Sequence, residues 1–215
     1  VPSEKIAVIK NGVNRELFAP LPKDKDIVEQ LNLQDRKVIG YIGTHGMAHK
    51  LDFILKCAKD MKGKNNYHFL MIGSGAERSK LVDYKDKNDL INVTMLDSVP
   101  KAEVRRYISV LDVALINLKK SDLFKTVIPS KIFENAGMQK PVLLGVQGEA
   151  QEIIEHYHAG LCFEPENEED FMEKLDTLAN DEQLYMECQE GCCALSKDFD
   201  RKKLANDMLD IITTI

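Results

Sequence analysis

Short apolar runs alternate with helical stretches along most of this chain, and that alternation limits the folds available to it. The runs carry too few polar positions to leave one face in water, so we predict buried strands at residues 38–43, 69–72, 92–96, 112–117, 141–144 and 161–163. Helices are predicted at 26–33, 51–61, 76–85, 101–109, 149–157 and through most of 168–215. Strands that alternate with helices at this interval predict an α/β fold with a doubly wound, Rossmann-like parallel sheet.

Size, charge and cysteine content exclude several classes of protein. The chain has 215 residues, 44% hydrophobic and 30% charged, which suits one domain with a sizeable core. Its 29 basic and 35 acidic residues give a net charge of −6 without a basic stripe, so no nucleic-acid partner is expected. No apolar run approaches the roughly 20 residues that span a bilayer. The five cysteines lack metal-site spacing and are predicted to be free thiols in a reducing cytoplasm.

The segment 129–144 is the main candidate for a binding site. Pro129 cannot lie inside a helix and Ser130 is a favourable N-cap, so a helix is predicted to begin there. Gly137 and Pro141 predict where it ends, and a buried strand follows.

Lys131 and Glu134 occupy that helix three residues apart, so they share one face. A helix N-terminus offers free N–H groups and the positive end of a dipole, both of which suit a phosphate. Glu134, one turn deeper, is placed to accept the two hydroxyls of a ribose. The alternative is an ordinary solvated ion pair between the two side chains.

Pro-Ser-Lys-Ile-Phe-Glu followed by Gly-Met-Gln-Lys-Pro-Val-Leu resembles the donor-binding motif of retaining glycosyltransferases of the GT-B fold, family 4 or "group 1". The resemblance is strongest to the bacterial O-antigen and capsule branch. It implies that this chain is the C-terminal half of such an enzyme. Residues 1–20 would be an interdomain connector, 21–199 the nucleotide-sugar-binding Rossmann-like domain, and 200–215 a C-terminal helix that returns to the first domain. From the residues themselves, 5–10 also predict a short strand.

The resemblance assigns roles along the motif. Ser130 and Lys131 would lie against the donor diphosphate, and Glu134 would hold the ribose. The backbone of Val99 would face the base, which the resemblance implies is uracil. The motif departs from the common pattern at Thr126, where many family members carry a glutamate that contacts the donor sugar.

The loop after the first predicted strand departs from the family as well. Its glycines let the backbone approach an anion closely, and Gly46 is a candidate for that contact. Family members place an Arg and a Lys here, whereas this chain has Thr44 at the Arg position and His49 or Lys50 at the Lys position. His45 and His49 are candidate ligand contacts or plain surface histidines.

The implied reaction transfers a hexose or an N-acetylated amino sugar from a UDP-sugar to a saccharide or lipid-linked acceptor held by an upstream N-terminal domain. No side chain here has the setting of a nucleophile or general base, so no catalytic residue is assigned and the isolated chain should transfer nothing. No metal or other cofactor is expected, because basic side chains and helix dipoles stabilise the leaving diphosphate. The expected location is cytoplasmic, membrane-peripheral for the full-length enzyme.

Two other functions remain open. A nucleotide-sugar 2-epimerase of the same fold would need acid/base carboxylates and histidines in the cleft, and the sequence does not identify them. A non-catalytic module would bind a partner through the acidic C-terminal helices. NAD binding is disfavoured because Gly73-Ser74-Gly75 is followed by Arg78 where a dinucleotide fingerprint has its third glycine.

Overall fold

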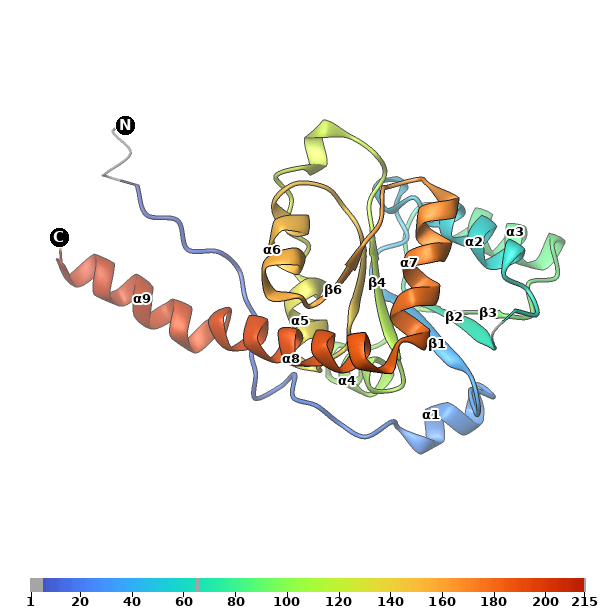
Figure 1. Cartoon of the computed structure of the whole chain (residues 1–215), viewed down its shortest axis with the longest axis horizontal. Coiled ribbons are helices and arrows are strands. Elements are labelled where there is room, and N and C mark those ends of the chain that lie inside the picture. Colours follow the sequence, from blue (N-terminus) through green and yellow to red (C-terminus); the bar gives the residue numbers. More distant parts are fainter. Residues whose placement is uncertain (1–5, 65, 215) are drawn as a thin grey trace.

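The computed structural model describes residues 6–64 and 66–214, which form a six-stranded sheet with helices on both faces (Figure 1). The strands are β1 (Lys37–Ile42), β2 (Tyr67–Ile72), β3 (Val93–Leu96), β4 (Val113–Asn117), β5 (Val142–Gly145) and β6 (Gly160–Cys162). All neighbours pair in parallel, in the order β3-β2-β1-β4-β5-β6. The predicted doubly wound parallel sheet is confirmed.

Helices cover both faces of this sheet. They are α1 (Lys25–Gln30), α2 (Leu51–Asp60), α3 (Arg78–Lys87), α4 (Lys101–Ser109), α5 (Lys131–Gly137), α6 (Glu149–Tyr157), α7 (Glu168–Asn180), α8 (Glu182–Asp198) and α9 (Arg201–Thr214), with 3-10 turns η2 (Met47–His49) and η3 (Asp122–Phe124). Residues of α2, α3 and α7 form the core on one face, and residues of α1, α4, α5 and α6 form the cores on the other. Because both faces are covered, β2 and β4 are buried at every position.

The strand order creates a switch point between β1 and β4. The chain builds outward from β1 through β2 to β3 and then returns to place β4 on the other side of β1. The loops that follow β1 and β4 therefore diverge to opposite sides of the sheet. Ligands of open α/β sheets bind at the carboxyl ends of the strands beside such a point.

The strand predicted at 5–10 is wrong for residues 6–10, which have no regular secondary structure; residue 5 lies outside the described residues. An apolar stretch forms a strand only where a neighbouring strand supplies hydrogen bonds. Here the chain pairs only at Val13, through an isolated bridge with Asp200. Val13 and Phe18 are buried against α5, so the segment is held mainly by packing.

The predicted ends of the 129–144 helix are only partly right. Ser130 is the N-cap of α5, but its backbone is already helical (φ −58°, ψ −26°) and its side chain makes no capping hydrogen bond. Gly137 lies inside the helix rather than after it, and Gln139 takes the left-handed conformation (φ 53°). A Cβ on Gly137 would come 2.7 Å from the carbonyl oxygen of Phe18, so this glycine admits the close approach of the N-terminal segment.

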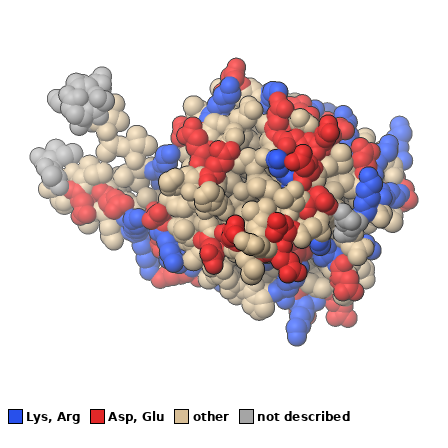
Figure 2. All heavy atoms as spheres, viewed as in Figure 1, with Lys and Arg blue, Asp and Glu red and all other residues tan. Residues whose placement is uncertain are grey.

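Residues 6–12 and α9 leave the same side of the domain (Figure 1). The backbone N–H of Val13 donates to the Phe199 carbonyl (2.9 Å), that of Arg201 donates to the Val13 carbonyl (2.9 Å), and the Arg201 guanidinium donates to the Gly12 carbonyl (2.8 Å). None of the helices between residues 6 and 214 combines the length and apolar content needed to cross a bilayer. On the face seen in Figure 2, acidic and basic side chains are interspersed.

Candidate functional site

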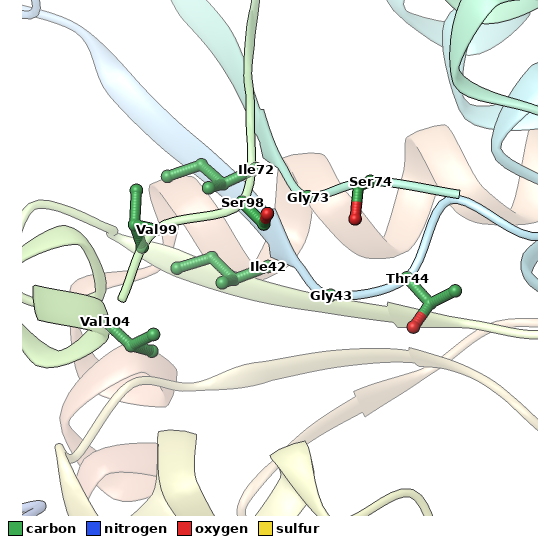
Figure 3. A pocket seen from close by; sticks show the side chains of 9 residues that line it. All are labelled: Ile42, Gly43, Thr44, Ile72, Gly73, Ser74, Ser98, Val99 and Val104. Atoms are coloured by element: carbon green, nitrogen blue, oxygen red, sulfur yellow. The ribbon is translucent and has the colours of Figure 1, made fainter. Parts of the chain in front are cut away.

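A cavity of about 240 Å³ opens where β1, β2 and β3 end (Figure 3). Its lining residues are Ile42, Gly43, Thr44, Ile72, Gly73, Ser74, Ser98, Val99 and Val104. Four aliphatic side chains gather at one end, from Ile42, Ile72, Val99 and Val104, while Thr44 and Ser74 lie at the other. The cavity therefore offers an apolar end and a polar end to a single ligand.

Two glycines shape the floor of this cavity. Gly43 and Gly73 both have positive φ, 155° and 153°. A Cβ on Gly73 would lie 1.8 Å from the carbonyl oxygen of Gly43, so the loops after β1 and β2 touch backbone to backbone. A Cβ on Gly43 would lie 2.4 Å from the ammonium nitrogen of Lys131. The positive φ favours glycine at position 43, and a side chain there would also displace the Lys131 ammonium group.

Lys131 places a cation at this edge of the sheet. Lys131 begins α5, which packs on one face of the sheet, whereas the Tyr41 side chain packs on the other face. The Lys131 Nζ nevertheless lies 4.2 Å from the centroid of the Tyr41 ring. The Tyr41 hydroxyl donates to the Thr44 carbonyl (2.8 Å), which fixes the ring. Burial lowers the pKa of Lys131 to about 8, against a smaller opposing effect of Glu134. Among the described residues no carboxylate lies within ion-pair distance of Lys131, so the solvated ion pair with Glu134 is not formed.

Glu134 lies one turn deeper on α5 and is partly buried. Burial raises the pKa of its carboxyl group, while Lys101, Arg201 and Lys131 act in the opposite direction. These cations begin α4, α9 and α5, so the carboxylate faces the region where the three helices start. Lys101 comes two residues after Val99, which lies at the apolar end of the cavity. Because Lys101 also acts on Glu134, we place the Glu134 carboxylate toward that end.

His45 is fully buried between the loops after β1 and β2. Its backbone N–H donates to the Ser74 carbonyl (2.8 Å) and its carbonyl accepts from the Glu77 N–H (2.9 Å). Neither ring nitrogen has a hydrogen-bond partner among the described residues. Burial, together with the charges of Arg78 and Lys131, lowers the pKa of His45 to about 4. The imidazole is therefore neutral at physiological pH.

His49 lies at the end of η2 and is half-buried. Its ring packs edge-on against Tyr41, with centroids 5.8 Å apart. Burial lowers the pKa of His49, and Lys131 adds to that effect. The Asn117 side chain at the end of β4 donates to the His49 carbonyl (2.9 Å), which ties η2 to the switch point.

The structure separates some residues that the sequence grouped together. Val99 shares the cavity with Thr44, and Lys131 reaches the same loop. Gly46 and Lys50 instead line a second cavity of about 410 Å³ between the start of α2 and α3. The Lys50 ammonium is already paired with Asp52 at 2.9 Å, so it is less available to an anion than Lys131 is.

Three residues important for the geometry were not predicted: Tyr41, Arg78 and Asn117. Tyr41 was grouped with its apolar neighbours because nothing in a strand pattern shows which cation a ring will meet. Arg78 replaces the third glycine of a dinucleotide fingerprint; its guanidinium donates to the Gly73 carbonyl (3.2 Å) and pairs with Asp97 (2.9 Å). Asn117 had a usable signal, since it is a polar residue ending a strand that is otherwise apolar.

The candidate metal ligands do not converge. Between residues 6 and 214, leaving out residue 65, no group of three or more His, Cys, Asp or Glu side chains has the geometry of a metal site. All five cysteines are free, namely Cys57, Cys162, Cys188, Cys192 and Cys193.

The fold and the cation at its switch point define a Rossmann-like domain of the type found in GT-B glycosyltransferases. The chain belongs to the family of group 1 glycosyl transferases, which it matches over residues 8–191.

Individual relatives resemble this chain over different lengths. A match to TuaH of Bacillus subtilis (strain 168), described as a glycosyltransferase of teichuronic acid biosynthesis, is 32% identical and covers 65% of this chain and 34% of TuaH. The structure of HepE from Anabaena in complex with UDP-glucose superposes with a TM-score of 0.85 at 17% identity, covering 100% of this chain and 59% of HepE. The C-terminal domain of the group 1 protein LpcC from Francisella tularensis gives 0.69 at 18% identity, covering 87% and 97%. The chain therefore spans only part of TuaH and HepE.

Proposed function

We propose that this chain is the C-terminal, donor-binding half of a retaining glycosyltransferase that uses a UDP-sugar. The observation that carries the proposal is Lys131, a partly buried ammonium group without a carboxylate partner that meets the glycine end of β1. Desolvating a cation is unfavourable unless an anion compensates it. A diphosphate bound against Gly43 and Thr44 would supply that anion.

The cavity accommodates the rest of a nucleotide in one direction. The base would occupy the apolar end beside Val99, and the diphosphate would lie at the polar end beside Thr44 (Figure 3). Glu134 would accept hydrogen bonds from the ribose hydroxyls, as its position near the Val99 side supports. The UDP and UDP-glucose held by HepE, a protein of the same fold, support uracil as the base.

In the reaction, Lys131 would stabilise negative charge as it develops on the leaving diphosphate. The acceptor hydroxyl would attack the sugar from the side that the diphosphate leaves, which retains the anomeric configuration. We propose no nucleophile in this half and no metal cofactor. The similarity to TuaH, which is named for teichuronic acid biosynthesis, supports a role in making a bacterial polysaccharide. We further propose a saccharide or lipid-linked acceptor of the O-antigen or capsule kind and a cytoplasmic site of action.

The acceptor would be held by an N-terminal domain. The partial coverage of TuaH and HepE supports this division. So does the match to the C-terminal domain of LpcC, which covers 97% of that domain. Helix α9 supports it as well, because it exposes Met208, Leu209, Ile211 and Ile212. We propose that this apolar face packs on the first domain, as large exposed apolar patches commonly mark an interface.

Calorimetric titration with UDP and, separately, with NAD tests the proposal. We expect UDP to bind and NAD to bind more weakly or not at all. Lys131→Ala and Glu134→Ala should each weaken UDP binding by about 1–3 kcal/mol, the usual effect of losing a charged hydrogen-bond partner. A preference for NAD, or full UDP affinity in both variants, would refute the assignment. Conversion of UDP-N-acetylglucosamine to its 2-epimer would favour the epimerase instead.

A further inference from the structure

Two imidazole rings take the place of permanent cations in the loop after β1. His45 and His49 lie on either side of Tyr41, with ring centroids 6.0 and 5.8 Å from the tyrosine ring. The Lys131 ammonium lies over the same ring, 4.2 Å from its centroid. Two imidazoles and one ammonium therefore surround a single aromatic side chain at the polar end of the cavity.

The two histidines lack the partners that would settle their protonation. Both ring nitrogens of His45 are buried without a hydrogen-bond partner, and no carboxylate between residues 6 and 214, residue 65 aside, forms an ion pair with either ring. An unpartnered buried polar group is unfavourable. The free domain tolerates the unpartnered ring nitrogens because both rings are uncharged. An anion bound nearby would favour the protonated form of the rings and raise their pKa.

The groups facing the pair come from three elements, two of which supply a charge. Lys131 of α5 faces both rings, and Arg78 of α3 faces His45. Arg78 is already bound to the Gly73 carbonyl and to Asp97, so its charge is partly compensated. From β4, Asn117 contributes an uncharged hydrogen bond to the His49 carbonyl. The side-chain charges that act on the pKa values of the two rings are cationic, so they disfavour protonation of the rings in the free site.

We propose that binding of a nucleotide-sugar diphosphate is coupled to uptake of one proton by the His45–His49 pair, which supplies a positive charge that the free site lacks. This inference rests on the proposed function and adds to it. The proton comes from solvent, adds to an imidazole nitrogen without breaking another bond, and returns to solvent when the nucleotide leaves. We assign the proton to the pair rather than to one ring, because two interacting titratable groups have pKa values that belong to both together.

Lys131 and Glu134 are the other titratable groups of the proposed donor site. The Lys131 pKa of about 8 means that this ammonium is largely charged below that pH, so it takes up little further proton there. Burial raises the pKa of Glu134, and protonation of this carboxyl group would weaken rather than strengthen its hold on ribose hydroxyls. Proton uptake between about pH 6 and about pH 7, where Lys131 is already almost fully charged, therefore reports mainly on the histidines.

Calorimetry with UDP-glucose measures the uptake directly. The diphosphate of this probe is esterified at both ends and has no proton that titrates in the window. Binding is measured in two buffers of different protonation enthalpy. We expect uptake of up to one proton per molecule bound and an affinity that falls by up to about tenfold per pH unit as pH rises.

Two variants and a control identify the acceptor. His49→Lys places a permanent cation beside Tyr41, so binding should persist while its pH dependence and proton uptake disappear. His49→Gln should weaken binding at acidic pH and take up less proton. His156→Gln, a histidine on α6 outside the cluster, should behave like the unmodified domain.

The outcomes separate the two proposals. UDP-glucose binding with equal affinity across the window and without proton uptake would overturn the coupling and leave the donor site standing. A His49→Lys variant that keeps the original pH slope and proton uptake would also overturn it. Absence of UDP and UDP-glucose binding at every pH would overturn the proposed function together with the coupling.

Discussion

Replacing Lys131 by methionine should stabilise the free domain while it weakens donor binding. Methionine keeps the length of the side chain and removes its charge. Burial lowers the pKa of Lys131 from 10.5 to about 8, and a change of that size corresponds to about 3 kcal/mol against the charged folded form. Losing the contact with Tyr41 offsets about 1 kcal/mol of this gain. We therefore expect the free energy of unfolding to rise by about 2 kcal/mol at neutral pH.

The pH dependence has a defined sign. Between about 8 and 10.5 the unfolded chain binds the Lys131 proton and the folded chain does not, so the stability of the unmodified domain should rise with pH across that window. The Lys131→Met variant should lack the Lys131 part of this rise and keep the part that Lys140 contributes. Urea denaturation near neutral pH and near pH 10 measures both effects, and calorimetry should show UDP binding weakened by about 1.5–3 kcal/mol.

Lys140 provides a matched control. It is also a buried lysine with a pKa lowered to about 8 by burial, but its ammonium donates to the carbonyls of Ser109 and Leu111, both at 2.8 Å. Lys140→Met would also remove a buried charge, but it would leave two carbonyls unpaired at about 1–3 kcal/mol each. The two effects oppose each other, so Lys140→Met should not stabilise the domain and should leave UDP affinity unchanged. If Lys131→Met likewise fails to stabilise the domain and binds UDP normally, Lys131 is a structural cation and the reasoning fails.

Three further changes test the frame of the site. Asn117→Ala removes the hydrogen bond to the His49 carbonyl. It should lower the free energy of unfolding by about 1 kcal/mol and weaken UDP binding. Unchanged stability would contradict this prediction. Gly73→Ala would set a Cβ 1.8 Å from the Gly43 carbonyl oxygen, so a melting curve should show a marked loss of stability; a wild-type curve would show that the loops move apart easily. Burial lowers the pKa of His68 from 6.5 to about 4, so the unfolded chain binds its proton first as pH falls. His68 should contribute a drop of about 2 kcal/mol in stability between pH 7 and 5, and His68→Gln should remove that contribution in urea titrations.

The sheet was predictable because its signals are local. Runs such as the one that became β4 are apolar at nearly every position, which occurs when helices cover both faces. The strand predicted at residues 6–10 was wrong because its formation depends on a partner segment far away in the sequence. A strand needs a partner, and the sequence could not show that Val13 would find only Asp200.

The site was predictable to a lesser degree. Val99 lines the cavity because it closely follows the end of β3, and Lys131 reaches Gly43 at the end of β1 from the start of α5. Both could be predicted because parallel strand ends share one edge of the sheet. Tyr41 could not be predicted as the partner of Lys131, since the two come from opposite faces and meet only over the edge. The ion pair of Lys50 with Asp52 likewise depends on side-chain placement that spacing alone does not determine.

The N-terminal segment and α9 leave the domain side by side, at residues 12 and 201, and this determines how the domain would bear mechanical load. A pull applied through both segments would fall first on the short ladder that links Val13 with Phe199 and Arg201, and these hydrogen bonds would open one after another. The sheet lies outside that line of force. Any motion transmitted through these segments could thus bend or peel the ladder while the pocket beside Lys131 keeps its shape.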